Sequence, residues 1–184
     1  MGKPEEERWY MHQAYDTVQL NNNWRVSFDN WNTLGLKEAY NIDSMFSSTD
    51  WGDEALKSFT GKARYISSFE LDDSDKEVKQ YILRIEDVRE TAEVIINGIQ
   101  CGTIWAYPTQ MEVDPEILKS VNHIEIIVQN LSSNYMKIYD RENPQWKKFY
   151  DINFVDITYT PFNPSQWHDE PSGIIGNIYL VKEK

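Results

Sequence analysis

The stretch from Phe59 to Leu131 reads FTGKARYISSFEL (59–71), then YILRIEDV (81–88), then AEVIINGIQCGTIWAYPTQMEV (92–113), then NHIEIIVQNL (122–131). Turn residues separate these four apolar runs, and Asn97-Gly98 stands at the central break. An Asn-Gly pair between β-branched runs is a strong hairpin signal, because both residues tolerate a positive φ. Short alternating runs with turns between them predict an all-β sandwich.

The rest of the chain extends this pattern in both directions. Strands are predicted at 24–28, 64–71, 123–130, 152–159 and 174–181, and residues 114–115 begin a short helical turn in which Pro115 takes the first position. Residues 50–58 are expected to form one or two helical turns with Asp50 as N-cap, and residues 131–150 a long polar and aromatic loop. We therefore predict a jelly-roll β-sandwich of about eight or nine strands with one or two short helical turns.

Length and charge limit the classes of protein to consider. The chain has 184 residues, which suits a single β-sandwich domain over 18–184 after a loosely held lead-in over 1–17. The formal net charge of −12 argues against a nucleic-acid partner and against an anionic membrane surface, because phosphate contacts need a basic surface. Neutral ligands and bound cations remain open.

The cysteine count and the length of the apolar runs bear on the compartment of the protein and on membrane attachment. The single cysteine, Cys101, excludes an internal disulfide but does not decide the redox compartment. No apolar run approaches the ~20 residues of a membrane span, and the start has no apolar core of the signal-peptide type. The chain is therefore expected to be either cytoplasmic or an excised piece of a longer exported protein.

Several of these segments together carry a family resemblance that covers roughly Val18 to Leu180. They are WRVSF (24–28), FTGKA (59–63), Tyr65, AEVIING (92–98), Gly102, Trp105, Pro108, VQN (128–130), Asn134 and PSGIIG (171–176). In this order and spacing, they resemble the galactose-binding-like jelly-roll modules of bacterial glycoside hydrolases. The similar modules are the sugar-binding domain of β-galactosidase/β-glucuronidase-type enzymes and the terminal module of α-L-rhamnosidase-like enzymes.

The resemblance implies an accessory role and an extracytoplasmic location, periplasmic or secreted. In such enzymes the catalytic carboxylates lie in a separate barrel domain, and an (α/β) barrel needs about 250 residues. This chain is too short to contain one, so we expect that it is not itself an enzyme. Its expected partners are a glycan or oligosaccharide and a catalytic domain of the same parent chain.

Loop aromatics and nearby polar groups are the candidate ligand-binding residues. Sugar rings present apolar C–H faces that stack on indole and phenol rings, while their hydroxyls need amide, Arg or carboxylate partners. The candidates are Trp105, Tyr107, Asn134, Arg141, Trp146 and Trp167. The alternative for each aromatic is that it fills an end of the sandwich or packs on a neighbouring domain, and for the polar residues that they belong to a solvated loop. At least one of Trp51, Trp105, Trp146 and Trp167 is expected to be exposed.

No cofactor is expected apart from a possible structural calcium ion, which modules of this kind often carry. The spacing of Asp73, Asp75 and Glu77 imitates the start of an EF-hand loop but lacks its glycine and its closing glutamate, so an acidic hairpin turn is the preferred interpretation. His168-Asp169-Glu170 is a second, similar candidate.

Three hypotheses for the function therefore stand. The first is a carbohydrate-binding module, and the second is a structural module whose aromatic surface docks on a catalytic barrel. The third is a small stand-alone glycosidase, which needs two carboxylates facing each other across a cleft with one pKa raised. A flat apolar patch favours docking, whereas aromatics that line a groove with polar groups favour glycan binding.

Overall fold

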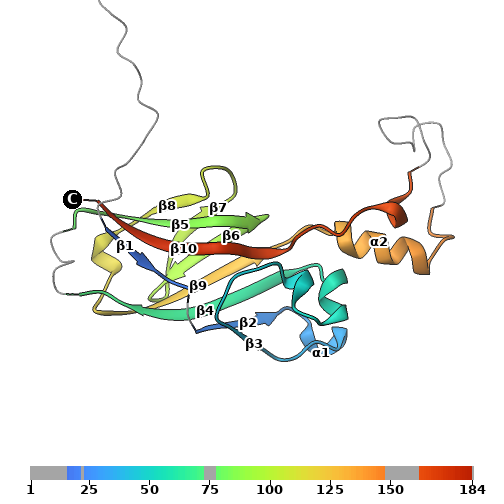
Figure 1. The fold of residues 1–184 in the computed structure, drawn as a ribbon, viewed down its shortest axis with the longest axis horizontal. Coiled ribbons are helices and arrows are strands. Elements are labelled where there is room, and N and C mark those ends of the chain that lie inside the picture. Colours follow the sequence, from blue (N-terminus) through green and yellow to red (C-terminus); the bar gives the residue numbers. More distant parts are fainter. Residues whose placement is uncertain (1–15, 22, 73–77, 148–161, 184) are drawn as a thin grey trace, which may run out of the picture.

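The structure is a computed structural model, and it describes residues 16–21, 23–72, 78–147 and 162–183. Two antiparallel sheets face each other in these ranges, which confirms the predicted all-β sandwich (Figure 1). One sheet has the strand order β1-β10-β5-β8 and the other has β3-β2-β4-β9-β6-β7. The strands are β1 (Asp16–Gln19), β2 (Trp24–Phe28), β3 (Tyr40–Ile42), β4 (Lys62–Glu70), β5 (Gln80–Arg89), β6 (Thr91–Ile96), β7 (Ile99–Ile104), β8 (Gln110–Val113), β9 (Val121–Gln129) and β10 (Gly173–Glu183).

Alternation along β4 and β9 decides which face of the larger sheet turns inward. Tyr65 and Ile126 are both fully buried and stand opposite each other, while Arg64 on the outer face is exposed. Because side chains in a strand alternate with period two, this register places every second residue in the core. The predicted inward faces of both strands are confirmed.

The Asn97-Gly98 turn connects β6 to β7 as predicted. Both residues have a positive φ, 53° for Asn97 and 81° for Gly98, and the turn brings Ile96 opposite Ile99. The Asn97 side chain adds tertiary contacts, since its Nδ2 donates to the Ile117 carbonyl at 2.8 Å. The turn therefore also ties the hairpin to the loop before β9.

The core lies between the two sheets and contains aliphatic side chains from both. Trp24 is its largest fully buried member, and its indole Nε1 donates to the Leu20 carbonyl at 2.5 Å. Leu83, Ile85 and Leu180 enter the core from the smaller sheet. Their neighbours on β5 and β10 must therefore point to the opposite, outer face of that sheet.

The structure corrects the sequence-based expectations in several places. A ten-residue helix, α2 (Ser133–Glu142), forms where a loop was predicted. The strands β1, β3 and β8 were not predicted, and β1 begins inside the expected lead-in. The short helices are α1 (Trp31–Leu34), η1 (Ser48–Asp50), η2 (Glu54–Ser58), η4 (Pro115–Ile117) and η5 (Pro164–Gln166).

Two of the short helices have an aspartate as N-cap; for one of them the sequence predicted a different residue as the cap, and the other begins where it was predicted. Asp53, not Asp50, caps η2, because its carboxylate accepts from the Ala55 amide at 3.1 Å. The predicted turn after Asp114 forms as η4, with the Asp114 carboxylate accepting from the Glu116 amide at 2.9 Å. The strand predicted over 152–159 lies outside the described residues.

Candidate functional site

The loop between β7 and β8 presents two aromatic side chains to solvent. Trp105 is 75% exposed and Tyr107 is 80% exposed. Thr109 anchors the end of this loop, because its carbonyl accepts from the Ile85 amide at 2.9 Å and its hydroxyl donates to the Ile85 carbonyl. Since β5 fixes the loop at Thr109, the two exposed rings start from a well-defined backbone position.

A small cavity of about 200 Å³ lies against this loop and combines aromatic with charged groups. Its lining residues are Asp87, Val88, Arg89, Glu90, Trp105, Ala106, Tyr107 and Thr109. The Arg89 guanidinium donates to the Asp87 carboxylate at 2.7 Å and 3.0 Å, so the two charges are paired within the wall. The aromatics therefore lie beside hydrogen-bonding groups and not on a flat apolar patch.

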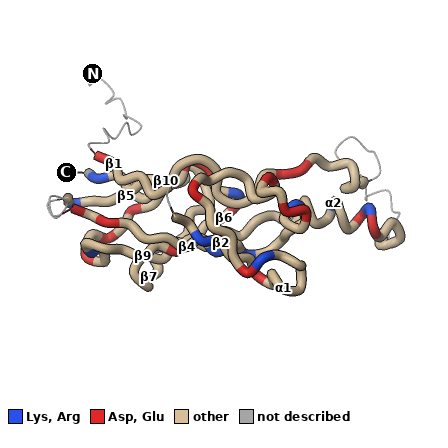
Figure 2. The backbone as a smooth tube through the Cα atoms, turned by 60° about the horizontal axis from the view of Figure 1, so that its bottom comes forward, with Lys and Arg blue, Asp and Glu red and all other residues tan. Residues whose placement is uncertain are grey.

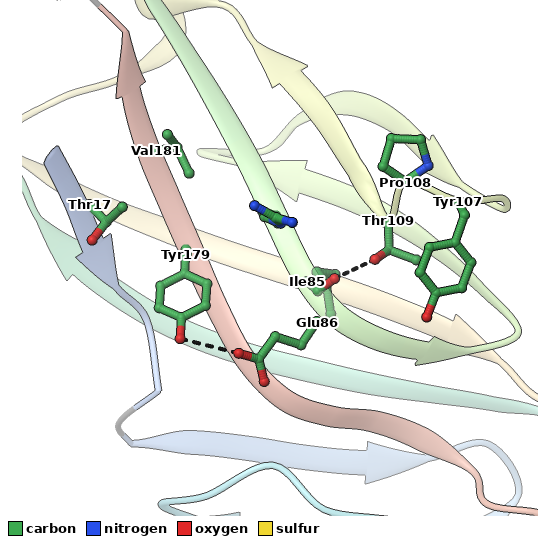
Figure 3. Close-up of a pocket in the computed structure, with 9 residues that line it drawn as sticks. Thr17, Ile85, Glu86, Tyr107, Pro108, Thr109, Tyr179 and Val181 are labelled. Carbon is green, nitrogen blue, oxygen red and sulfur yellow. Dashed lines mark hydrogen bonds between the residues drawn. The ribbon is translucent and has the colours of Figure 1, made fainter. Parts of the chain in front are cut away.

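A larger groove of about 430 Å³ continues from Tyr107 across the outer face of the smaller sheet (Figure 3). Its lining residues are Thr17, Arg84, Ile85, Glu86, Tyr107, Pro108, Thr109, Tyr179 and Val181. Tyr107 and Thr109 line both this groove and the smaller cavity, so the two hollows lie on either side of the same loop residues. β5, β10 and β1 supply the floor, and the β7–β8 loop supplies one wall.

Glu86 is the carboxylate of this groove, and hydrogen bonds fix its position. It accepts from the Asn177 amide at 2.8 Å, from the Asn177 side-chain Nδ2 at 3.0 Å and from the Tyr179 hydroxyl at 3.3 Å. The hydrogen bonds from Asn177 lower the pKa of Glu86 below its ordinary value. Glu86 is therefore a charged acceptor that is already oriented in the free protein.

At the other group of predicted residues, around α2, the polar side chains hold the chain together. Asn134 is 2% exposed, and its side chain exchanges two hydrogen bonds with the Glu170 backbone, at 2.7 Å and 2.8 Å. Arg141 donates through Nε and Nη2 to the Ser165 carbonyl at 3.1 Å and 2.8 Å. Both side chains attach α2 to the segment that leads into β10.

Asp140 organises the end of α2. Its buried carboxylate accepts from the Trp146 indole at 2.6 Å, from the Lys147 ammonium at 2.8 Å and from the Ser165 amide at 3.2 Å. Burial alone would raise the pKa of Asp140, but the bonds from Lys147 and Trp146 outweigh it and lower that pKa. Trp146 is therefore held through its indole nitrogen.

The structure thus divides the six predicted site residues into two groups. Trp105 and Tyr107 lie together beside the two hollows, whereas Asn134, Arg141 and Trp146 take part in contacts around α2. Trp167 packs edge-on against Phe162 near η5 and is still 41% exposed. Trp105 and Trp167 are exposed, which confirms the expectation that at least one of Trp51, Trp105, Trp146 and Trp167 is exposed.

Arg84, Glu86 and Tyr179 were missed at the sequence level. Arg84 and Tyr179 are paired residues of β5 and β10, although more than ninety positions separate them in the chain. Alternation in each strand indicates which side chains point outward, but only the register between the strands brings them together.

Metal binding finds no support in the described part of the chain, where no three His, Cys, Asp or Glu side chains gather as a metal site requires. Asp73, Asp75 and Glu77 lie outside the described residues. In the second acidic candidate, the Asp169 carboxylate forms an ion pair with the buried Lys137 ammonium. In Figure 2, the basic residues lie scattered among acidic ones and form no continuous stripe over the described ranges.

Comparison with known proteins places this fold in large glycoside hydrolases. No family model matches the chain. Over 120 residues it is 30% identical to a Formosa agariphila protein named "Putative beta-glucuronidase", and the match covers 64% of this chain and 10% of that protein. The same fold occurs in a rhamnosidase from Novosphingobium sp. PP1Y, with a TM-score of 0.68 and 24% identity over 90% of this chain and 15% of that one. It also occurs in a Ruminococcus gnavus beta-glucuronidase, with a TM-score of 0.56 and 14% identity over 90% of this chain and 28% of that one.

The chain therefore spans about a tenth of the curated relative that it matches and less than a third of these solved structures. The proteins that it resembles are glycoside hydrolases, and the resemblance is to one small part of each. Within the described ranges, no helix combines the length and the apolar character that crossing a bilayer requires.

Proposed function

We propose that this chain is a noncatalytic, galactose-binding-like accessory module of an extracytoplasmic glycoside hydrolase and that it binds a glycan. The observation that carries the proposal is the pair of exposed rings, Trp105 and Tyr107, beside two hollows that share Tyr107 and Thr109 and contain charged groups. An indole or phenol ring can stack on the apolar face of a sugar, and neighbouring polar groups can bind its hydroxyls. Shallow sites of this kind bind with micromolar to millimolar dissociation constants, or about −8 to −4 kcal/mol.

Two further observations support a noncatalytic role. The chain matches only a small part of the glycoside hydrolases that resemble it. Glu86 and Asp140 both have a lowered pKa, whereas the general acid of a glycosidase needs a raised one. Incubation of the purified chain with the glycans that it binds is therefore expected to release no new reducing ends.

A glycan array followed by calorimetric titration with pectic and galactosidic oligosaccharides tests the proposal. Trp105→Ala is expected to weaken binding about tenfold or more, which corresponds to about 1.4 kcal/mol. Trp31→Ala is the matched control, because Trp31 is an exposed tryptophan on α1 that lines neither hollow. An array with no bound glycan, or equal losses in the two variants, would contradict the proposal.

A second function, docking on a catalytic barrel of the same parent chain, has support at the other group of residues. Leu131, Tyr135 and Trp167 are exposed: Leu131 lies just before α2, Tyr135 lies in its first turn, and Trp167 directly follows η5. Sedimentation of this chain with the Formosa agariphila relative from which the matching region has been deleted tests this function. Binding that Tyr135→Ser and Trp167→Ala abolish and Trp31→Ala preserves would favour docking, and absence of a complex would count against it.

A further inference from the structure

The groove on the outer face of the smaller sheet contains one carboxylate that hydrogen bonds fix in place but whose acceptor positions are not all occupied. A carboxylate has about four acceptor positions. Asn177 and Tyr179 occupy three of those of Glu86: Oε1 accepts from the Asn177 Nδ2 and the Tyr179 hydroxyl, and Oε2 accepts from the Asn177 amide. Oε2 therefore keeps capacity for one more donor, and Glu86 is exposed to the groove.

The backbone of β10 is shaped to receive this carboxylate. The register between β10 and β5 shifts between Ile175 and Ile178, and Gly176 in this irregular stretch has φ +86°. A Cβ atom at Gly176 would lie 2.2 Å from Glu86 Oε2, so a residue other than glycine would displace the carboxylate. The position of Glu86 thus depends on a glycine whose backbone conformation other residues rarely adopt.

Asn177, which holds Glu86, is itself held by Gln19 of β1 and by Asn21 just after it. Its Oδ1 accepts from the Gln19 Nε2 at 2.9 Å and from the Asn21 Nδ2. The Asn21 Oδ1 in turn accepts from the Ile178 amide at 2.9 Å. A chain of side-chain hydrogen bonds therefore fixes the acceptor before any ligand arrives, which lowers the entropy cost of binding.

Donors and an apolar surface complete the groove around Glu86. Arg84 precedes it by two residues on the same outer face of β5, and the Tyr179 ring lies alongside (Figure 3). Tyr107 forms the opposite wall and belongs to the cavity of Trp105 as well. Tyr107 therefore stands between the cavity of Trp105 and the groove of Glu86.

We propose that this groove is a second subsite, in which Glu86 accepts a hydrogen bond from a hydroxyl of a neutral oligosaccharide that extends from Trp105. The proposal rests on the carbohydrate-binding function proposed above and specifies its ligand as neutral and longer than two sugar units. One charge-assisted acceptor and one guanidinium match a hydroxyl-rich sugar, which donates and accepts at neighbouring oxygens.

Two other classes of ligand fit the groove less well. The two linings contain three carboxylates, Glu86, Asp87 and Glu90, against two guanidinium groups, and Arg89 already pairs with Asp87, so a uronate would meet more like charge than free opposite charge. A divalent cation needs several oxygen ligands, whereas the groove lining contains a single carboxylate. A neutral sugar avoids both difficulties.

Calorimetric titration with galactobiose, galactotetraose, digalacturonate and tetragalacturonate tests the subsite. On the wild-type chain, galactotetraose is expected to bind about tenfold more tightly than galactobiose, because a hydrogen bond to a charged group contributes about 1.5 kcal/mol or more. Glu86→Gln is expected to remove this gain and to leave the affinity for galactobiose unchanged. Tyr179→Phe, which deletes one of the bonds that orient Glu86, is expected to remove part of it.

Glu70→Gln is the matched control, because Glu70 is an exposed glutamate on β4 in the other sheet. If Glu86→Gln binds galactotetraose as tightly as the wild type, or if tetragalacturonate binds as tightly as galactotetraose, the second subsite is wrong while the Trp105 site stands. If no probe binds, or if Trp105→Ala changes nothing, the carbohydrate-binding function itself fails and the subsite fails with it. A thermal melt of each variant identifies losses that are due to unfolding.

Discussion

Two tryptophan substitutions should separate the cost of losing a core side chain from the cost of losing a surface one. Trp105 is 75% exposed, whereas Trp24 is fully buried between the sheets. A tryptophan side chain has up to about 250 Å² of surface, so Trp105 buries roughly 60 Å² and Trp105→Ala should cost at most about 1.5 kcal/mol. Trp24→Ala should cost about 3–5 kcal/mol, because it also leaves a cavity and a Leu20 carbonyl without its donor.

The assays are urea unfolding and thermal unfolding, both followed by far-ultraviolet circular dichroism, since tryptophan fluorescence changes with the substitutions themselves. For a domain of this size, each kcal/mol corresponds to about 2–4 °C in Tm. Trp105→Ala should therefore lower Tm by about 6 °C or less, and Trp24→Ala by about 6 °C or more. A loss of 3 kcal/mol or more in Trp105→Ala would mean that this ring is packed, and the reasoning that makes it a ligand platform would fail.

Three further sets of substitutions test the scaffold. Asp140→Asn is expected to destabilise the fold by about 1–3 kcal/mol at neutral pH. Because folding lowers the pKa of Asp140, the charged carboxylate stabilises the fold fully above its ordinary pKa of 3.8, and this stabilisation is lost as the pH falls through the pKa of the folded state. The urea midpoints of wild type and variant should therefore converge as the pH is lowered through this range. Gly173→Ala places a Cβ 2.3 Å from the Tyr65 hydroxyl at φ +92° and should cost more than about 1 kcal/mol, and Tyr65→Phe in the same chain should recover part of this loss in a double-mutant cycle. Asn97→Ala should cost about 1–2 kcal/mol of stability, because the hydrogen bonds of the Asn97 side chain are lost. Asn97→Gly should cost nearly as much, although glycine keeps the turn conformation. An unchanged urea midpoint in either variant would contradict this role of the side chain.

The sheets were predictable where one face of a strand is apolar and the other polar. β4 and β9 alternate without interruption, so their inward faces could be assigned from the sequence. β1, β3 and β8 have only three or four residues each, which is too short for a period to appear. They exist because longer neighbouring strands offer them hydrogen bonds.

Helix α2 shows why hydrophobic periodicity can fail. Its buried residues are Asn134, Lys137 and Asp140, which recur every three positions and are all polar. The inward stripe of this helix is therefore built from hydrogen bonds and an ion pair, so its buried face is not marked by apolar residues in the sequence. The helix is stabilised by its tertiary contacts with the segment before β10, which a single sequence does not reveal.

The sequence predicted the part of the candidate site that comes from one continuous segment, but not the part that comes from strands far apart in the chain. Trp105 and Tyr107 follow the hairpin directly, so their place on a loop was clear from the sequence. Glu86 and Tyr179 come from strands that are far apart in the chain and meet through the register of β5 with β10. Only the fold assembles that half of the groove.

The two groups of aromatic residues lie on different parts of the sandwich, and this bears on how both proposed functions could coexist. The groove lies on the outer face of the four-stranded sheet, whereas α2 extends beyond the end of both sheets (Figure 1). A partner domain that covered the exposed side chains of α2 would therefore leave Trp105 and Glu86 open to solvent. Glycan binding and docking then become separable properties, so Tyr135→Ser should abolish docking without affecting a glycan, and Trp105→Ala should do the reverse. A variant at either place that lost both properties would show that the two surfaces form one.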